Sequence, residues 1–173
     1  SYAKADLYNV TAFNTNDAAY TETLDLLWLD LSLTTNRSRA NNLAMFPSYR
    51  MATQNEVQTL FGSAFPGLGP NLGTAYSQNY SGQALTSINT NIERWFTVFG
   101  HSLENTNFKY SYGRYDNKMV GIFQRKDNNR WTAFGPNNTS AAIGTAADVY
   151  RADFLVKDIS GVELALIRSE AGF

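Results

Sequence analysis

The most apolar run of the chain extends from Leu24 to Leu31, with sequence LDLLWLDL. Its length suits a buried strand, although periodicity alone does not separate a short apolar strand from a helix. The segment before it, residues 1–24, is polar and aromatic with weak alternation, which is typical of an edge strand. We therefore divide the chain into an N-terminal arm over 1–24 and a single globular domain over 25–173.

Two helices are predicted after this run. The first covers about 36–45, with N-cap candidates at 34–36 and with its two alanines and Leu43 on one face. The second begins at a capping box, in which the hydroxyl of Thr53 accepts from the third helical amide and Glu56 reaches back to the N-cap amide.

A third helix is predicted over about 86–99, because Ile88, Ile92 and Trp95 follow the spacing of an amphipathic helix. Gly100 is its expected C-terminal stop. Residues 62–82, between the second and third helices, are rich in glycine and are expected to form a long loop.

The remainder of the chain predicts strands. Aromatic and polar residues alternate over 108–115, and further strands are expected at 119–124 and 130–134, with turns at 116–117 and 126–129. Residues 149–156 and 162–167 predict a closing hairpin. The fold class is therefore α+β, with two or three short helices in the N-terminal half packed on an antiparallel sheet.

Composition favours an extracellular, β-rich protein. Only 17% of the 173 residues are charged, and 18 Asn, 16 Thr and 13 Ser supply much of the polar surface. The same bias also fits any neutral β-rich fold. The net charge is −1 and there is no basic run, so nucleic-acid binding is not expected. No apolar stretch approaches the roughly 20 residues that span a bilayer, so membrane insertion is not expected.

The residue types needed for most catalysis are scarce. The chain has no Cys and a single His, His101, which excludes disulfides, thiolate zinc sites and Cys nucleophiles. There is no nucleophile elbow, phosphate loop or dinucleotide fingerprint. The Asx clusters at 116–117 and 127–129 lack calcium-loop spacing and indicate turns. We expect no metal, no cofactor and no enzyme activity, with a two-carboxylate glycan hydrolase as the remaining enzymatic alternative.

Two motifs together carry a family resemblance. The stretch from Trp28 to Thr34 is WLDLSLT, and the stretch from Tyr49 to Phe61 is YRMATQNEVQTLF. They resemble the WLDLT…WRYAT…EV…LF pattern of secreted Gram-negative proteins, many of which carry a PEP-CTERM sorting tail. More distantly they resemble Lcl-type lectin-like domains. The resemblance implies a C-type-lectin-like α+β fold, a surface or matrix location, and no catalytic residues.

These motifs also have plain structural interpretations. We expect Trp28 to lie in the core. Arg50 is expected to be a structural ion-pair partner, with Asp30 as the candidate carboxylate. Thr53 and Glu56 are expected to act as the helix cap alone.

Aromatic residues of the strand region form a candidate ligand surface. Tyrosine and tryptophan rings beside amides and carboxylates suit sugar binding, and they also suit protein interfaces. Cross-strand aromatic packing is the structural alternative. The candidate surface comprises Tyr110, Tyr112, Tyr115, Asp116, Asn117 and Trp131.

The leading functional hypothesis is an extracellular structural or adhesive subunit that associates with itself, including as a filament. The N-terminal arm is expected to join a neighbouring copy by adding a strand to a sheet edge. The candidate assembly contacts are Tyr2, Tyr8, Val10, Phe13 and Phe173. The alternative hypothesis is a lectin-like domain that binds polysaccharide.

Overall fold

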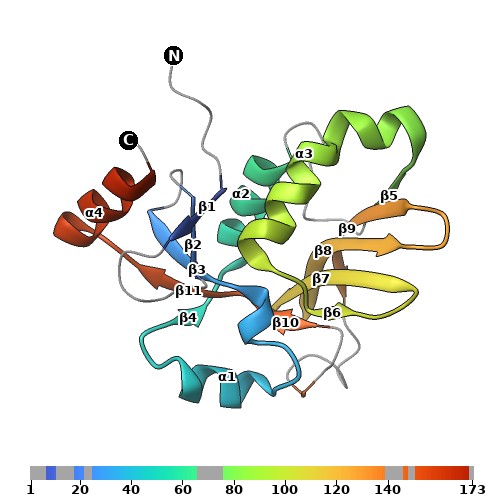
Figure 1. Ribbon diagram of the computed structural model, residues 1–173. Coiled ribbons are helices and arrows are strands. Elements are labelled where there is room, and N and C mark those ends of the chain that lie inside the picture. Colours follow the sequence, from blue (N-terminus) through green and yellow to red (C-terminus); the bar gives the residue numbers. More distant parts are fainter. Residues whose placement is uncertain are drawn as a thin grey trace.

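The computed structural model describes residues 7–10, 18–21, 25–65, 76–138, 146–147 and 151–171. Within these ranges the chain forms four α-helices and two sheets (Figure 1). The predicted α+β class is confirmed.

The first sheet combines strands from both ends of the chain. Its order is β1 (Leu7–Val10), β2 (Ala18–Thr21), β3 (Leu26–Leu29), β11 (Leu155–Asp158) and β4 (Arg50–Met51), and every neighbouring pair is antiparallel. Since β2 pairs with β3 along four residues, the strands of the predicted arm belong to this sheet of the same chain. The boundary predicted at residue 24 therefore falls inside this sheet.

The second sheet is built mainly from hairpins. Its order is β10 (Ala152–Asp153), β7 (Phe108–Tyr115), β8 (Lys118–Arg125), β9 (Arg130–Asn138) and β5 (Tyr76–Tyr80), while β6 (Leu103–Glu104) also pairs with β7. Only β10 and β7 are parallel among these pairs. The predicted turns are confirmed, and Asp116 and Asn129 occupy them with φ of 50° and 48°, a region that Asp and Asn tolerate.

Two of the predicted helix boundaries are confirmed. α2 (Gln54–Ala64) begins at a capping box in which Glu56 N donates to Thr53 Oγ1 at 3.3 Å and Thr53 N donates to Glu56 Oε2 at 3.1 Å. α3 (Gly82–Phe99) ends at Gly100, whose φ of 69° suits glycine. The predicted loop over 62–82 overlaps two elements, because α2 continues to Ala64 and β5 precedes α3, while residues 66–75 lie outside the described ranges.

The first predicted helix starts later than expected. A 3-10 turn, η2 (Leu31–Leu33), precedes α1 (Arg39–Met45), whose N-cap is Ser38. The side chain of Ser38 accepts a hydrogen bond from Asn41 N at 3.2 Å. The predicted apolar face is wrong as well, since both alanines of α1 are exposed and its buried residue is Asn42.

The predicted closing hairpin is wrong, because its second half is α4 (Gly161–Ala171). β11 pairs instead with β3 and β4. Leu164 and Ile167, three residues apart, pack on the first sheet, which is a helical spacing. Glu163 in the first turn and Arg168 in the last turn also match the helix dipole.

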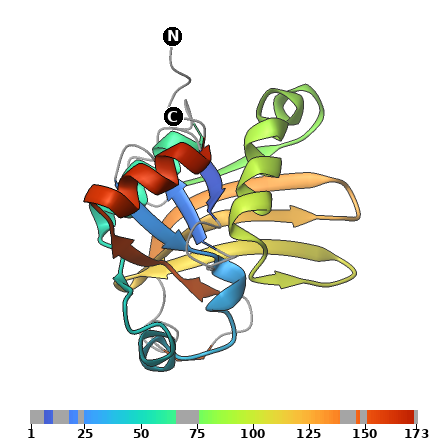
Figure 2. The same cartoon turned by 60° about the vertical axis from the view of Figure 1, so that its left-hand side comes forward.

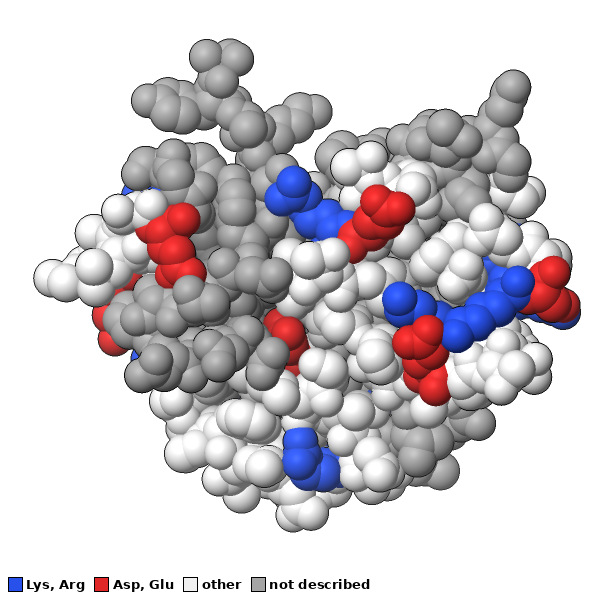
Figure 3. Space-filling view, in the orientation of Figure 1, with Lys and Arg blue, Asp and Glu red and all other residues white. Residues whose placement is uncertain are grey.

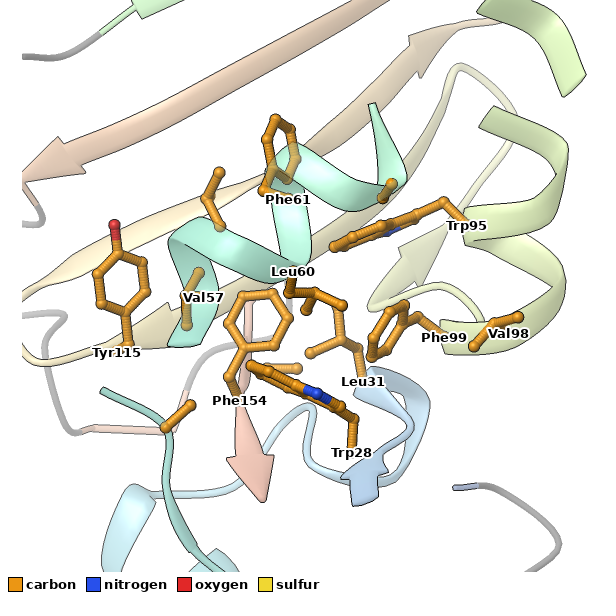
Figure 4. Close-up of a cluster of buried hydrophobic side chains, with 14 of the residues drawn as sticks. Trp28, Leu31, Val57, Leu60, Phe61, Trp95, Val98, Phe99, Tyr115 and Phe154 are labelled. Carbon is orange, nitrogen blue, oxygen red and sulfur yellow. The ribbon is translucent and has the colours of Figure 1, made fainter. Parts of the chain in front are cut away.

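The main core lies where the two sheets, α2 and α3 meet (Figure 4). Trp95 is fully buried, and its ring centroid lies 4.6 Å from that of Phe99 and 5.7 Å from that of Phe61. Its Nε1 donates to Ser111 Oγ at 2.9 Å, which ties α3 to β7. Trp28 is also fully buried, so its predicted core position is confirmed.

A second apolar cluster covers the other face of the first sheet. Leu27 and Leu29 point away from the main core and pack with Ile159 and Ile167. Figure 2 shows α4 lying across these strands. All four residues of β3 are buried because both faces of the strand are covered, which explains why its sequence is a continuous apolar run.

A buried polar network joins the second sheet to η2 and α1. Arg114 Nε and Nη2 donate to the two carboxylate oxygens of Asp153 at 3.0 and 3.2 Å, and both side chains are completely buried. Asn42 Nδ2 donates to the same carboxylate at 2.8 Å, and Arg39 Nε lies 3.5 Å from it. Thr34 completes the network, since its hydroxyl donates to Asp153 O at 2.9 Å.

Candidate functional site

The predicted ligand surface is divided between two faces of the second sheet. Side chains two apart on a strand share a face, so Tyr110 and Tyr112 lie on one face of β7 and Tyr115 on the other. The pairing of Lys109 with Gln124, and of Gln124 with Trp131, places Trp131 on the face of Tyr115. These residues therefore do not form one surface.

Tyr110 and Tyr112 pack in an aromatic cluster across β7 and β8. Tyr110 lies 5.0 Å from Tyr112 and 5.7 Å from Phe123, measured between ring centroids. Tyr112 is 8% exposed, and burial raises its pKa above the ordinary value. This is the cross-strand packing named as the structural alternative.

The other members of the predicted surface lie far from Trp131. Tyr115 is completely buried, and Asp116 and Asn117 are exposed in the turn that follows it. Trp131 aligns with Lys109, six residues along β7 from Tyr115, which corresponds to about 20 Å. Of the predicted set, only Trp131 lines a groove between α3 and the second sheet.

A groove of about 460 Å³ lies between α3 and the second sheet. Residues from adjacent turns of α3 form one wall. The other wall comes from three neighbouring strands, whose contributions are aligned by the sheet register. The described lining comprises Ile92, Glu93, Phe96 and Thr97 of α3, Lys109 of β7, Gln124 of β8 and Trp131 of β9.

The apolar part of the groove is aromatic. Trp131 is half-buried and meets Phe96 edge to face, with ring centroids 5.3 Å apart. Lys109 Nζ lies over the Phe96 ring, 4.6 Å from its centroid, which is a cation–π contact. Both rings also pack against the main core, so the groove has a supported floor.

Polar side chains of the groove keep hydrogen-bonding capacity. Within the described residues, Glu93 accepts one hydrogen bond, from Asn89 Nδ2 at 2.9 Å. Gln124 donates one, from Nε2 to Asn129 Oδ1 at 2.8 Å. A carboxylate has about four acceptor positions, and an amide has a second N–H and a carbonyl oxygen. Both residues can therefore bind a ligand without losing their present partners.

Charges of both signs surround the groove without forming a single-sign patch. Figure 3 shows blue and red side chains interspersed with white surface over α3 and the hairpins of the second sheet. Glu104 lies directly across from Lys109 in the β6–β7 register. Its carboxylate accepts from Lys126 Nζ at 2.9 Å, and this hydrogen bond lowers the pKa of Glu104.

Acidic groups are few in the described lining of the groove. Most glycoside hydrolases use a pair of carboxylates on either side of the scissile bond. The described lining of the groove contains Glu93 as its single carboxylate. Within the described residues, no group of three or more His, Asp or Glu side chains is arranged to hold a metal ion.

The expected partner of Arg50 was wrong, although its structural role is confirmed. Its guanidinium donates to both carboxylate oxygens of Glu56, at 3.0 and 2.8 Å, and to both of Asp158, at 3.0 and 2.9 Å. The expected partner, Asp30, lies instead beside Tyr49, where its charge adds to burial in raising the pKa of Tyr49. Arg50 thus joins the α2 capping box to the end of β11.

Of the candidate assembly contacts, Tyr8 and Val10 belong to β1, an edge strand of the first sheet. Tyr2, Phe13 and Phe173 lie outside the described residues.

Sequence reasoning missed most of the groove. The helix predicted over 86–99 contains Phe96, and the alternation predicted over 108–115 makes Lys109 a polar strand residue, but neither prediction points to a groove. The available signal was the register: the turns at 116–117 and 126–129 align Lys109, Gln124 and Trp131 across three strands. The sequence does not show that α3 packs over this part of the sheet.

Comparison with protein-family models, curated proteins and solved structures gives no match to this chain. The resemblance to secreted Gram-negative proteins and the C-type-lectin-like relationship therefore stay predictions. No helix within the described ranges is long and apolar enough to cross a membrane.

Proposed function

We propose that this chain is an extracellular, non-catalytic adhesive domain that binds saccharides in the groove between α3 and the second sheet. The observation that carries the proposal is the half-buried ring of Trp131, which lines an open groove beside a carboxylate, an amide and a hydroxyl. An aromatic ring offers a flat apolar surface for the C–H face of a sugar. Glu93, Gln124 and Thr97 offer acceptors and donors for its hydroxyls.

The size and construction of the groove support this proposal. Ligand sites are usually concave, mostly apolar, and contain a few convergent polar groups, with volumes of about 300 to 1,000 Å³. The groove has about 460 Å³ and places its polar groups on both walls. The strands and helix that form it are tied together through the core, so the site is largely preformed.

The extracellular location is supported by the sequence. The polar residues are dominated by Asn, Thr and Ser rather than by charges. The motifs that begin at Trp28 and Tyr49 resemble secreted surface and matrix proteins.

Substitution of Trp131 tests the proposal. Trp131→Ala removes the stacking ring, and loss of a dominant contact of about 2 kcal/mol weakens binding roughly thirtyfold. Binding is measured first on a panel of immobilised glycans and then by calorimetry with the best oligosaccharide. Tyr110→Ala is the matched control, because Tyr110 is a partly buried aromatic on the opposite face of the same sheet.

Two results would contradict the proposal. One is a panel on which the wild-type chain binds no saccharide at all. The other is unchanged affinity in Trp131→Ala, provided that circular dichroism shows the variant to be folded.

A specific observation favours self-association as a second candidate function. Val162 and Leu166 of α4 are 77% and 50% exposed and lie four residues apart, so they form an apolar stripe on one side of the helix. The stripe fits a two-fold contact between identical chains.

A further inference from the structure

We infer that the groove selects anionic saccharides, with Lys109 as the group that binds their acid substituent. The inference rests on the proposed function and names the ligand class of the same site. It starts from the environment of the Lys109 ammonium, which differs from that of the other lysines in the described ranges.

Lys109 is placed in the groove by its strand and by an aromatic ring. It lies on the face of β7 that α3 covers, and it is half-buried. Its ammonium is held over Phe96 at 4.6 Å from the ring centroid. A ring face is a weaker partner for an ammonium than a carboxylate is, so an incoming anion improves the environment of this charge.

The other described lysines already have polar partners. Lys118 Nζ donates to Gln54 Oε1 at 2.8 Å and Lys126 Nζ donates to Glu104 Oε1 at 2.9 Å. Lys157 Nζ lies 3.8 Å from Glu163 Oε1. Lys109 forms no ion pair within 4 Å in the described part of the chain. Its charge acts on Glu104, its cross-strand neighbour, but the hydrogen bond to that carboxylate comes from Lys126.

The negative charge of Glu93 does not cancel the preference of the groove for an anionic ligand. It is exposed, so water stabilises its charge, and it accepts a hydrogen bond from Asn89. Lys109 is half-buried and its ammonium contacts the Phe96 ring, so an anion supplies the full counter-charge that a ring face lacks. Glu93 then serves as an acceptor for sugar hydroxyls, while Lys109 binds the acid group.

The acid group can be a carboxylate, as in a uronic acid, or a sulfate ester. A lysine ammonium is a compact point charge, whereas the planar fork of arginine matches a carboxylate in two hydrogen bonds. Lys109 therefore recognises negative charge without fixing the geometry of the acid. A uronic acid and a sulfate ester both offer a negative charge to Lys109, and the ligands used in the test distinguish them.

The test compares charged and neutral forms of the same sugar. Calorimetry is performed with galacturonic acid oligomers, with their methyl esters, which lack the charge, and with a sulfated dextran oligosaccharide against unmodified dextran. We expect charged ligands to bind about ten- to a hundredfold more tightly than their neutral counterparts, as one charge-assisted hydrogen bond predicts. Binding of the uronate alone, or of the sulfate ester alone, identifies which acid the groove takes.

Variants assign the effect to Lys109. Lys109→Gln should abolish the charged-over-neutral preference, whereas Lys109→Arg should restore it. Lys157→Gln is the matched control, since it makes the same charge change on the first sheet. The preference should also fall as salt is raised, because ions screen exposed charges over about 10 Å at 0.1 M.

The outcomes separate this inference from the proposed function. Equal affinity for charged and neutral forms, or an unchanged preference in Lys109→Gln, overturns the inference and leaves saccharide binding intact. Absence of binding to every ligand, charged or neutral, overturns both. A preference lost equally in Lys157→Gln shows a general charge effect and also overturns the assignment to Lys109.

Discussion

Removing the negative charge of Asp153 should destabilise the fold more than any surface charge change. Asp153 and Arg114 have side-chain exposures of 0%, and two hydrogen bonds at 3.0 and 3.2 Å join them. Asp153→Asn keeps the size of the side chain but leaves the guanidinium of Arg114 buried without its counter-charge. It also turns an amide N–H₂ toward donors, including Asn42 Nδ2, which now donates at 2.8 Å.

The expected magnitude follows from the burial of the pair. Breaking a buried ion pair by removing one partner costs about 3 to 5 kcal/mol. The free energy of unfolding of a domain is about 5 to 15 kcal/mol, so a large fraction is lost. At about 2 to 4 °C per kcal/mol for a chain of this size, the Tm should fall by roughly 6 to 20 °C. Urea unfolding and calorimetry measure both quantities.

Two further variants make this prediction refutable. Asp158→Asn removes a carboxylate that is hydrogen-bonded to Arg50 but is 70% exposed. This substitution should lower the free energy of unfolding by about 1 kcal/mol or less. Combining Asp153→Asn with Arg114→Met should destabilise less than the sum of the two single changes, because the second removes the orphaned charge. If the free energy of unfolding of Asp153→Asn lies within about 1 kcal/mol of the wild-type value, the buried pair of Asp153 and Arg114 is not a major support of the fold.

Two more predictions concern association and alkaline pH. If α4 mediates self-association, Leu166→Glu should convert dimers to monomers in light scattering. The control Met45→Glu, at a residue of α1 that is 56% exposed, should leave the dimers intact. A wild-type chain that stays monomeric at high concentration contradicts self-association through α4. Burial raises the pKa of the Tyr115 hydroxyl in the folded chain. At about pH 10 the unfolded chain releases the hydroxyl proton while the folded chain keeps it. The free energy of unfolding should therefore fall as pH rises above about 10. Tyr115→Phe should weaken this fall, because it removes the titrating hydroxyl. The substitution breaks no hydrogen bond within the described residues. An unchanged pH dependence of urea unfolding would show that another group is responsible.

Local signals in the sequence predicted the parts of the fold that local physics decides. The capping box at Thr53, the stop at Gly100 and the two hairpin turns depend on a few neighbouring residues, and all are confirmed. The helix α4 was missed because its apolar residues also fit a strand. Its identity is decided by β11, which already has partners on both sides and leaves no edge for the following segment.

The candidate site was harder to predict because it depends on contacts between distant segments. Of the predicted ligand surface, Trp131 lines the groove, whereas Tyr110 and Tyr112 lie on the opposite face of the sheet. Assigning faces requires the register of three strands, and finding the groove also requires the placement of α3. The expected pair of Asp30 and Arg50 failed for the same reason, since Asp158 is 108 residues from Arg50 along the chain.

The position of β11 has a consequence for how the chain is made. β11 lies between β3 and β4, so the first sheet can be completed only after residue 158 has been synthesised. Until then, Trp28 and the leucines of β3 lack partners on one edge of their strand. Contacts of such long sequence separation slow folding and prolong the exposure of apolar surface. A nascent chain therefore keeps this edge of β3 open until β11 has been made, and chains truncated before β11 should aggregate instead of folding.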